Sequence, residues 1–313
     1  MALALFHMLV FPGFLFLSAF ALAAEYVDRK LCARLQNRLG PPWFQPFADL
    51  VKLAAKQDLV PEGADRRMFV LMPIIALTAT VTACLYIPIW GRQALFPFQG
   101  DVIVVLYLLT IPTMTFFLGG WYSRSVFSAI GAVRSIMQLF AYEIPLFLSI
   151  LGPALLANTW KLSEMAEFYG ARPGLALLNA IGLAVSLVAL LGKLERVPFD
   201  IPEAETEIVA GTFTEYSGRH LALFRLAVDI EAVVGATLLA AVFLPFGLGL
   251  GPVAGFVLYL VKVLVIVGVL ALLRTVFARL RIDQMINFCW QVLAPIAFAQ
   301  VLIDLVAKGL MKS

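Results

Sequence analysis

The sequence predicts an all-α integral membrane protein with about eight transmembrane helices. Hydrophobic residues make up 62% of the chain and charged residues only 14%, whereas soluble domains contain about 45–50% and about 25%. The apolar residues gather in long runs, and the charged residues gather between them. No internal repeat or linker separates a second unit, so we expect residues 1–313 to form a single polytopic domain.

Each apolar run is close to the length of about 20 residues that a helix needs to cross the hydrocarbon core. The first run contains no Lys or Arg, which disfavours a cleaved signal peptide and predicts a retained helix. The fourth run is longer than one span and contains Pro145 and Pro153, so we expect it to tilt, kink or protrude. The eight predicted spans are 4–24, 69–90, 101–120, 127–157, 174–194, 225–247, 253–274 and 286–307.

The loops between these runs differ in positive charge. Alternate loops contain 17 Lys and Arg residues, and the other side has 5. Positive loops stay in the cytoplasm, so both termini are predicted to lie outside. The predicted cytoplasmic loops are residues 25–68, 121–135, 193–225 and 274–284.

Composition also excludes several functions. The three cysteines are far apart without a CxxC pair, and the two histidines lie near different ends of the architecture. We therefore expect no zinc, iron–sulfur or bis-histidine haem site in this chain, and any redox centre to belong to a partner. The small net charge of +3, spread over several loops, predicts no nucleic-acid surface.

The first cytoplasmic loop contains an amphipathic helix, predicted over residues 43–57. Its apolar side chains recur at helical spacing, with charged residues on the other face. The helix lies at the membrane surface or against a partner, or it covers the end of the bundle. Nearby, Arg34 and Arg38 are one helical turn apart. Two interpretations are open: the pair contacts an anionic surface, or it is a solvated basic face that only fixes the membrane topology. The apolar face is Phe47, Leu50, Val51 and Ala54, and the polar face is Asp49, Lys52 and Lys56.

The loop before the sixth span is rich in carboxylates. We expect a helix that Asp200 caps, with Pro202 in its first turn and with Asp200, Glu203 and Glu207 on one face. Capping accounts for the first two carboxylates but not for the others. Crowding raises the pKa of carboxyl groups and suits them to proton relay. The five are Asp200, Glu203, Glu205, Glu207 and Glu215.

Two ionisable residues lie inside predicted spans. Glu143 belongs to the fourth run and Lys262 to the seventh. Charged groups at such depth are costly and are kept for a reason. Two interpretations remain open for each residue: buried pairing that supports the fold, or a place along a hydrated proton path.

At this point the sequence resembles a known family. Residues 197–218, VPFDIPEAETEIVAGTFTEYSG, resemble the signature loop of the complex I membrane subunit that borders the quinone cavity. This family comprises the H subunit of NADH-quinone oxidoreductase and respiratory-chain subunit 1. The homologous subunits of energy-converting membrane-bound nickel–iron hydrogenases and formate hydrogenlyases are similar. Three further segments match in family order: RLQNRLGPPWFQPFADLVKLAAKQDLVP, AIGAVRSIMQLFAYEIPL and RLRIDQMINFCWQVLAP.

Two departures from complex I favour the hydrogenase-type branch. Gly40-Pro41-Pro42 runs directly into Trp43 without the usual insertion, and residues 278–284 replace a PRxRYDQ motif. Against this, residues 142–146 and 283–285 are similar to complex I. We favour the hydrogenase-type branch, with a genuine NADH-quinone oxidoreductase subunit as the alternative.

The resemblance implies a membrane anchor and energy transducer in a redox-driven ion pump of a prokaryotic cytoplasmic membrane. Such a subunit binds no cofactor itself, although its pocket admits a quinone in complex I. Its partners contain the redox groups: an iron–sulfur small subunit and a large subunit with a nickel–iron centre, or flavin modules in the alternative. Antiporter-like subunits in the lipid bilayer then move H⁺ or Na⁺.

The resemblance also assigns roles to residues. The acidic loop and Glu143 match proton-relay positions, and Lys262 is added to them because of its depth. The basic side of the junction with the soluble arm matches Arg29, Arg34 and Arg38, with Asp49 beside them. A stand-alone H⁺ or Na⁺ transporter is a remote alternative, since such proteins often contain internal repeats. A third possibility is that the chain is only a structural anchor without a role in ion transport.

Overall fold

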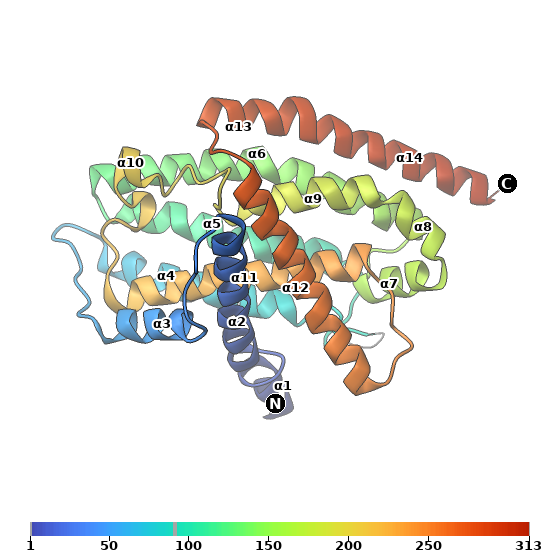
Figure 1. Cartoon of the computed structure of the whole chain (residues 1–313), viewed down its shortest axis with the longest axis horizontal. Coiled ribbons are helices and arrows are strands. Elements are labelled where there is room, and N and C mark those ends of the chain that lie inside the picture. The colour runs from blue at the N-terminus through green and yellow to red at the C-terminus, as the bar shows by residue number, and fades with distance from the viewer. Residues whose placement is uncertain (1, 90–92, 313) are drawn as a thin grey trace.

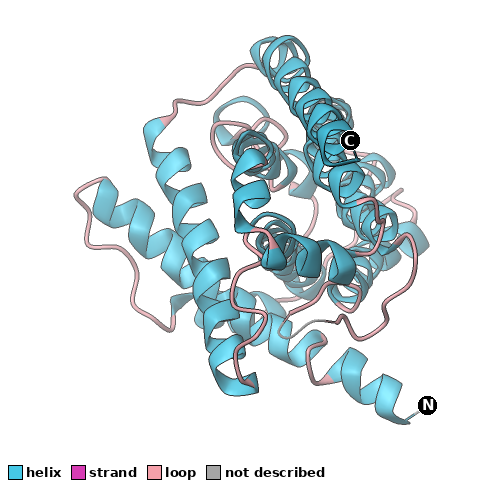
Figure 2. Ribbon diagram, turned by 90° about the vertical axis from the view of Figure 1, so that its right-hand side faces the viewer, coloured by secondary structure: helices cyan, strands magenta, loops and turns pink. Residues whose placement is uncertain are grey.

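The protein is a bundle of helices in the computed structural model, which describes residues 2–89 and 93–312 (Figure 1). The side chains of Ala2, Glu205, Thr206 and Lys312 lie outside this description. Every regular element in the described part is helical (Figure 2). The elements are α1 (Ala2–Leu9), α2 (Phe14–Leu35), α3 (Gln45–Ala55), α4 (Arg66–Cys84), α5 (Asp101–Tyr122), α6 (Val126–Ala157), α7 (Leu162–Ala171), α8 (Pro173–Leu178), α9 (Ala180–Lys193), α10 (Glu205–Ile208), η1 (Gly211–Phe213), α11 (Gly218–Phe243), α12 (Pro252–Val276), α13 (Ile282–Phe288), η2 (Cys289–Leu293) and α14 (Ala294–Lys312).

The predicted membrane architecture is confirmed. Seven helical segments of the described residues are long and apolar enough to cross a membrane. The shorter apolar helix α9, which α8 precedes, occupies the place of the predicted fifth span. The long fourth span is one continuous helix, α6, despite Pro145 and Pro153.

Several helix ends differ from the prediction. Helix α2 continues to Leu35, so the first eleven residues of the predicted loop 25–68 are helical. Helix α11 begins at Gly218 rather than at residue 225. Helix α4 ends at Cys84 rather than at residue 90, and residues 90–92 lie outside the described part. Helix α2 can continue through its charged residues because partners within the protein neutralise them. Hydropathy alone does not reveal these partners.

Helix α11 forms the centre of the bundle, where it packs against α2, α3, α4 and α12 (Figure 1). In its most apolar stretch, 83% of the residues are buried. Small residues allow this close packing, and Gly235 lies directly against Leu190 of α9. At the edge, α14 packs against α6 and α9 (Figure 1).

Ion pairs join the four loops that were predicted to share one side. Glu207 of loop 193–225 binds Arg134 of loop 121–135 and Arg279 of loop 274–284. Asp28 accepts hydrogen bonds from Arg196 and Arg274, which connects loop 25–68 with the same group. The four loops therefore lie at one end of the bundle.

Candidate functional site

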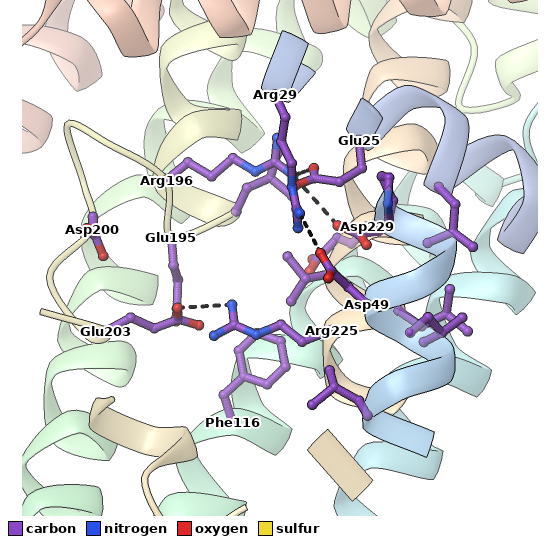
Figure 3. Close-up of a pocket in the computed structure, with 18 of the residues that line it drawn as sticks. Glu25, Arg29, Asp49, Phe116, Glu195, Arg196, Asp200, Glu203, Arg225 and Asp229 are labelled. Atoms are coloured by element: carbon purple, nitrogen blue, oxygen red, sulfur yellow. Dashed lines mark hydrogen bonds and ion pairs between the residues drawn. The ribbon is translucent and has the colours of Figure 1, made fainter. Parts of the chain in front are cut away.

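A cavity of about 780 Å³ opens among the residues of this end. Helices α2, α3 and α11 and the segment after α9 contribute its walls (Figure 3). Acidic and basic side chains line it in nearly equal number, so the charges of the lining residues largely neutralise one another. The acidic lining residues are Glu25, Asp49, Glu195, Asp200, Glu203, Asp229 and Glu231, and the basic ones are Arg29, Lys52, Lys56, Lys193, Arg196, Arg225, Arg274 and Arg279.

Arg196 is the central cation of the cavity. Its guanidinium donates to Glu25 at 2.6 Å and to Asp28 at 2.8 Å, and it lies 3.8 Å from Asp229. Burial lowers the pKa of Arg196, but the surrounding carboxylates outweigh burial and raise it above its ordinary value. Arg274 supports the same arrangement by binding Asp28 at 2.9 Å.

Arg29 connects this network to the amphipathic helix at the mouth. It binds Glu25 on its own helix at 2.7 Å and Asp49 of α3 at 3.0 Å (Figure 3). Gln45 donates to the other oxygen of Asp49 at 2.8 Å. Two predicted docking residues, Arg29 and Asp49, are therefore paired with each other.

Arg34 and Arg38 are exposed and do not line the cavity. Arg34 lies in the last turn of α2 and Arg38 follows its end. Their position leaves them accessible from outside the bundle.

Helix α3 was predicted over residues 43–57, and the structure confines it to Gln45–Ala55. Asp49 and Leu50 line the cavity, while Phe47 and Val51 are exposed. The helix thus covers one wall of the cavity, and part of its apolar face points outward.

The predicted helix that Asp200 caps is wrong. Helix α10 spans only Glu205–Ile208, and Ala204 occupies its N-cap position. Pro202 explains the difference, because the residue before a proline is driven away from helical backbone angles. Ile201 is therefore a poor first residue for a helix. Because α10 begins only at Glu205, Asp200, Glu203 and Glu207 do not share a helical face.

The acidic loop consequently divides. Glu203 and Asp200 line the cavity, and Glu203 accepts a hydrogen bond from Arg225 at 3.1 Å (Figure 3). Glu215 is half-buried and does not line the cavity. The predicted relay residue Glu205 has a side chain outside the described part.

Glu207 lies outside the cavity, between Arg134 at 2.5 Å and Arg279 at 3.1 Å. The hydrogen bond from Arg134, followed by the charge of Arg279, lowers the pKa of Glu207. The expectation that crowding raises carboxyl pKa values is therefore wrong for this residue, because arginine from two other loops neutralises it.

A buried ion pair lies deeper in the bundle. Lys193, at the end of α9, is 3.5 Å from Glu231 of α11, and their side chains are 1% and 0% exposed. Both residues line the cavity. Glu143 of α6 faces the charge of Lys193, and its two carboxylate oxygens are buried without a hydrogen bond among the described residues. The predicted relay residue Glu143 thus lies next to a charge pair that reaches the cavity.

Lys262 has a different setting. Its ammonium group donates to the backbone carbonyls of Leu244 and Phe246, just after the end of α11, and lies over the Phe246 ring. A cation at this position satisfies free carbonyls and complements the helix dipole. The structure places Lys262 apart from the cavity, with the contacts of a helix cap.

Sequence reasoning missed three residues that line the cavity, Glu25, Glu195 and Arg196, and also Asp28, which binds Arg196. Glu25 and Asp28 were assigned to a loop, and Glu195 and Arg196 were not singled out. Helical spacing of Glu25, Asp28 and Arg29 was the available signal, since residues three and four apart share a helix face. The pairing of Lys193 with Glu231 left no signal, because the two residues come from different helices.

None of the described residues forms a group of His, Cys, Asp or Glu that could hold a metal ion. The cavity offers alternating carboxylates and cations instead. Such an arrangement can bind and transfer protons, and it can respond to a charge that changes nearby.

The fold and the cavity together define a multi-pass membrane protein with an ion-paired junction at one end of its bundle. Residues 7–305 match the family model described as NADH dehydrogenase, and the chain belongs to this family.

Similar proteins agree with this assignment. The H subunit of NADH-quinone oxidoreductase from Carboxydothermus hydrogenoformans is 33% identical over 302 residues, which cover 93% of this chain and 85% of that protein. The corresponding protein of Bacillus cereus is 34% identical, with 90% and 88% covered. Among solved structures, a chain of the membrane-bound sulfane sulfur reductase, an archaeal respiratory membrane complex, superposes with a TM-score of 0.82 and 26% identity. The match covers 92% of this chain and 96% of that one.

Proposed function

We propose that this chain is the membrane-anchoring and energy-transducing subunit of a complex I-like, hydrogenase-type ion pump. The single observation that carries the proposal is the ion-paired cavity, which connects the clustered loops with the buried Lys193–Glu231 pair. A change of charge on a docked redox subunit would alter proton affinity in these carboxylates. Couplings of this kind are typically about 1–3 kcal/mol.

In this proposal the clustered loops face the cytoplasm and dock a soluble arm. The exposed Arg34 and Arg38 supply positive charge at the surface that the arm would contact. Iron–sulfur clusters belong to the small subunit of the arm, and a nickel–iron centre belongs to its large subunit. Antiporter-like membrane subunits then move H⁺ or Na⁺ across the cytoplasmic membrane of a prokaryote.

One feature of the cavity supports the hydrogenase-type branch over complex I. Its walls are rich in paired charges around Arg196, whereas pockets for apolar ligands are lined mostly by hydrophobic side chains.

The second candidate function is that of the membrane subunit of an NADH-quinone oxidoreductase with a quinone in the cavity. The identity of 33–34% with the NADH-quinone oxidoreductase proteins favours it. Leu50, Leu53 and Phe116 provide some apolar lining for such a ligand.

Purification through a tag on this chain in mild detergent separates the candidates, with mass spectrometry and metal analysis of the proteins that co-elute. Nickel, iron and a hydrogenase-like large subunit establish the hydrogenase-type branch. Flavin proteins without nickel, together with quinone reduction, establish the alternative. Recovery of this chain alone, still able to move ions in liposomes, overturns both and supports a stand-alone transporter.

A further inference from the structure

Glu195 is a buried carboxyl group of the cavity that the ion-pair network does not include. It follows the end of α9 and is 8% exposed. Its Oε1 accepts a hydrogen bond from the hydroxyl group of Ser135 on α6 at 2.9 Å. Among the described residues, no cation forms an ion pair with it. A carboxylate in such a place lacks the neutralisation that its neighbours receive.

The groups around Glu195 are acidic. Burial raises the pKa of Glu195 to about 8, the negative charges of Glu203, Glu231 and Asp200 add to this effect, and the hydrogen bond from Ser135 opposes it. Tyr142 on α6 also interacts electrostatically with Glu195.

The nearby cations are bound elsewhere. Arg225 donates to Glu203, Lys193 pairs with Glu231, and Arg196 binds Glu25 and Asp28. Glu195 therefore lies among charges that favour its protonated form.

The backbone supports this placement. Glu195 has a φ of 50°, in the left-handed region, and its N–H donates to the carbonyl of Gly192 at 3.2 Å. A left-handed residue at this position is a common end of a helix, and the N–H of Arg196 completes the cap by donating to the carbonyl of Leu191 at 3.2 Å. The cap fixes the backbone of Glu195, whose side chain points toward Glu203 inside the cavity (Figure 3).

We infer that Glu195 is the proton-relay residue that links the cavity carboxylates Glu203 and Asp200 with the buried Lys193–Glu231 pair. The inference rests on the proposed function and deepens it by naming the transfer site. Neutral Glu195 gives its proton, through water in the cavity, to the carboxylate of Glu231. Another proton from the side of Glu203 and Asp200 then restores the acid, so one proton enters and one leaves.

The first test is Glu195→Gln in the purified complex, reconstituted in liposomes. The amide keeps the shape and can still accept from Ser135, but it cannot release a proton. Partner subunits should co-purify as before, while the rate of ion translocation falls on the order of a hundredfold, as for a lost proton-transfer group. Glu164→Gln is the matched control, because Glu164 is an acidic residue on α7 outside the cavity. Unchanged translocation in Glu195→Gln overturns the inference.

The second test uses two neighbours that act in opposite directions. Ser135→Ala removes a hydrogen bond to the ionised form and should move the alkaline limb of the pH profile to higher pH. Glu203→Gln removes a negative charge and should move it to lower pH. If both variants shift the alkaline limb of the pH profile in the same direction, Glu195 does not determine that limb.

Infrared titration of the complex gives a readout that does not need ion pumping. The carbonyl absorption of protonated carboxyl groups should lose intensity near pH 8, and the part of this loss that belongs to Glu195 should be missing in Glu195→Gln. If the parent complex fails to translocate ions, the proposed function fails. If this loss of intensity is absent from the parent, the inference about Glu195 fails.

Discussion

Arg196 shows why one residue type is needed at the centre of the cavity. Its two terminal nitrogens reach carboxylates on two different turns of α2, and Asp229 of α11 lies nearby. A planar guanidinium can serve several oxygens at fixed angles, whereas an ammonium group is a single point of charge. Arg196 thus joins α2, the segment after α9 and α11 through one side chain.

Replacement of Arg196 by Met should destabilise the protein strongly. The change leaves Glu25 and Asp28 buried with less compensation, and breaking a buried ion pair costs about 3–5 kcal/mol. Thermal unfolding in detergent measures the loss, and Arg196→Lys should fall between the parent and Arg196→Met. Arg66→Met, at the exposed start of α4, is the control and should have little effect. Equal stability of the two Met variants would refute the role of Arg196.

Glu207 should make the acidic loop sensitive to acid. Its folded pKa lies below the ordinary value of 4.5, so its contribution is complete above that value and is lost as the pH falls through the lowered folded pKa. A spin label on Val209→Cys, an exposed site in this loop, should become mobile on acidification. With Glu207→Gln the label should be mobile at neutral pH already.

A second label, on Leu177→Cys, reports whether the whole protein unfolds in acid. Leu177 belongs to α8, away from the acidic loop, and is exposed. If both labels change together in the parent, the loop has no acid response of its own.

At the scale of elements, hydropathy predicts which segments are helices but not where they end. The spans matched because a helix inside the membrane must satisfy its own backbone groups. The start of loop 25–68 did not match, because α2 continues through Glu25 and Asp28, whose charges Arg29 and Arg196 neutralise. The residues around Glu25 and Asp28 do not indicate that Arg196, from a distant segment, will pair with them.

Helix α14 is held to the bundle partly by a buried polar group. Asp304 accepts a hydrogen bond from Gln300 at 3.0 Å, and Gln300 also donates to the carbonyl of Leu178 at 3.2 Å. On the facing helix α6, a Cβ atom at Gly152 would lie 2.3 Å from the Asp304 Oδ2. Close approach of the two helices therefore depends on this glycine.

Gly152→Ala should separate α6 from α14 and destabilise the protein by about 1–3 kcal/mol, as overpacking does. Gly309→Ala is the matched control on α14, because nothing lies within 4 Å of a Cβ atom there. Alanine in a helix interior should stabilise by about 0.5–1 kcal/mol relative to glycine. Thermal unfolding of both variants measures these changes in stability. If Gly152→Ala is as stable as the parent, α6 and α14 do not pack as closely as described.

At the scale of the whole molecule, topology predicted part of the site. Helices that alternate across a membrane bring every second loop to one side, so clustering of the four charged loops followed from the sequence. The individual partners did not. Arg196 and Glu25 are 171 residues apart, and neither periodicity nor composition indicates that they meet.

The same clustering makes membrane orientation a decisive test for the whole protein. The cavity lies among the loops with 17 of the Lys and Arg residues, and the positive-inside rule places this end in the cytoplasm. Cysteines introduced at Glu167 of α7 and at Glu62 before α4 occupy opposite predicted sides, and both positions are exposed. An impermeant maleimide added to intact cells should label Glu167→Cys, and Glu62→Cys only after permeabilisation.

The parent chain sets the background for this labelling, since Cys84 and Cys289 are buried and Cys32 is partly buried. The expected pattern leaves the cavity open to a cytoplasmic arm. The reverse pattern would turn the ion-paired cavity toward the outside, where no cytoplasmic redox subunit could dock. It would therefore refute the proposed docking together with the predicted position of both termini.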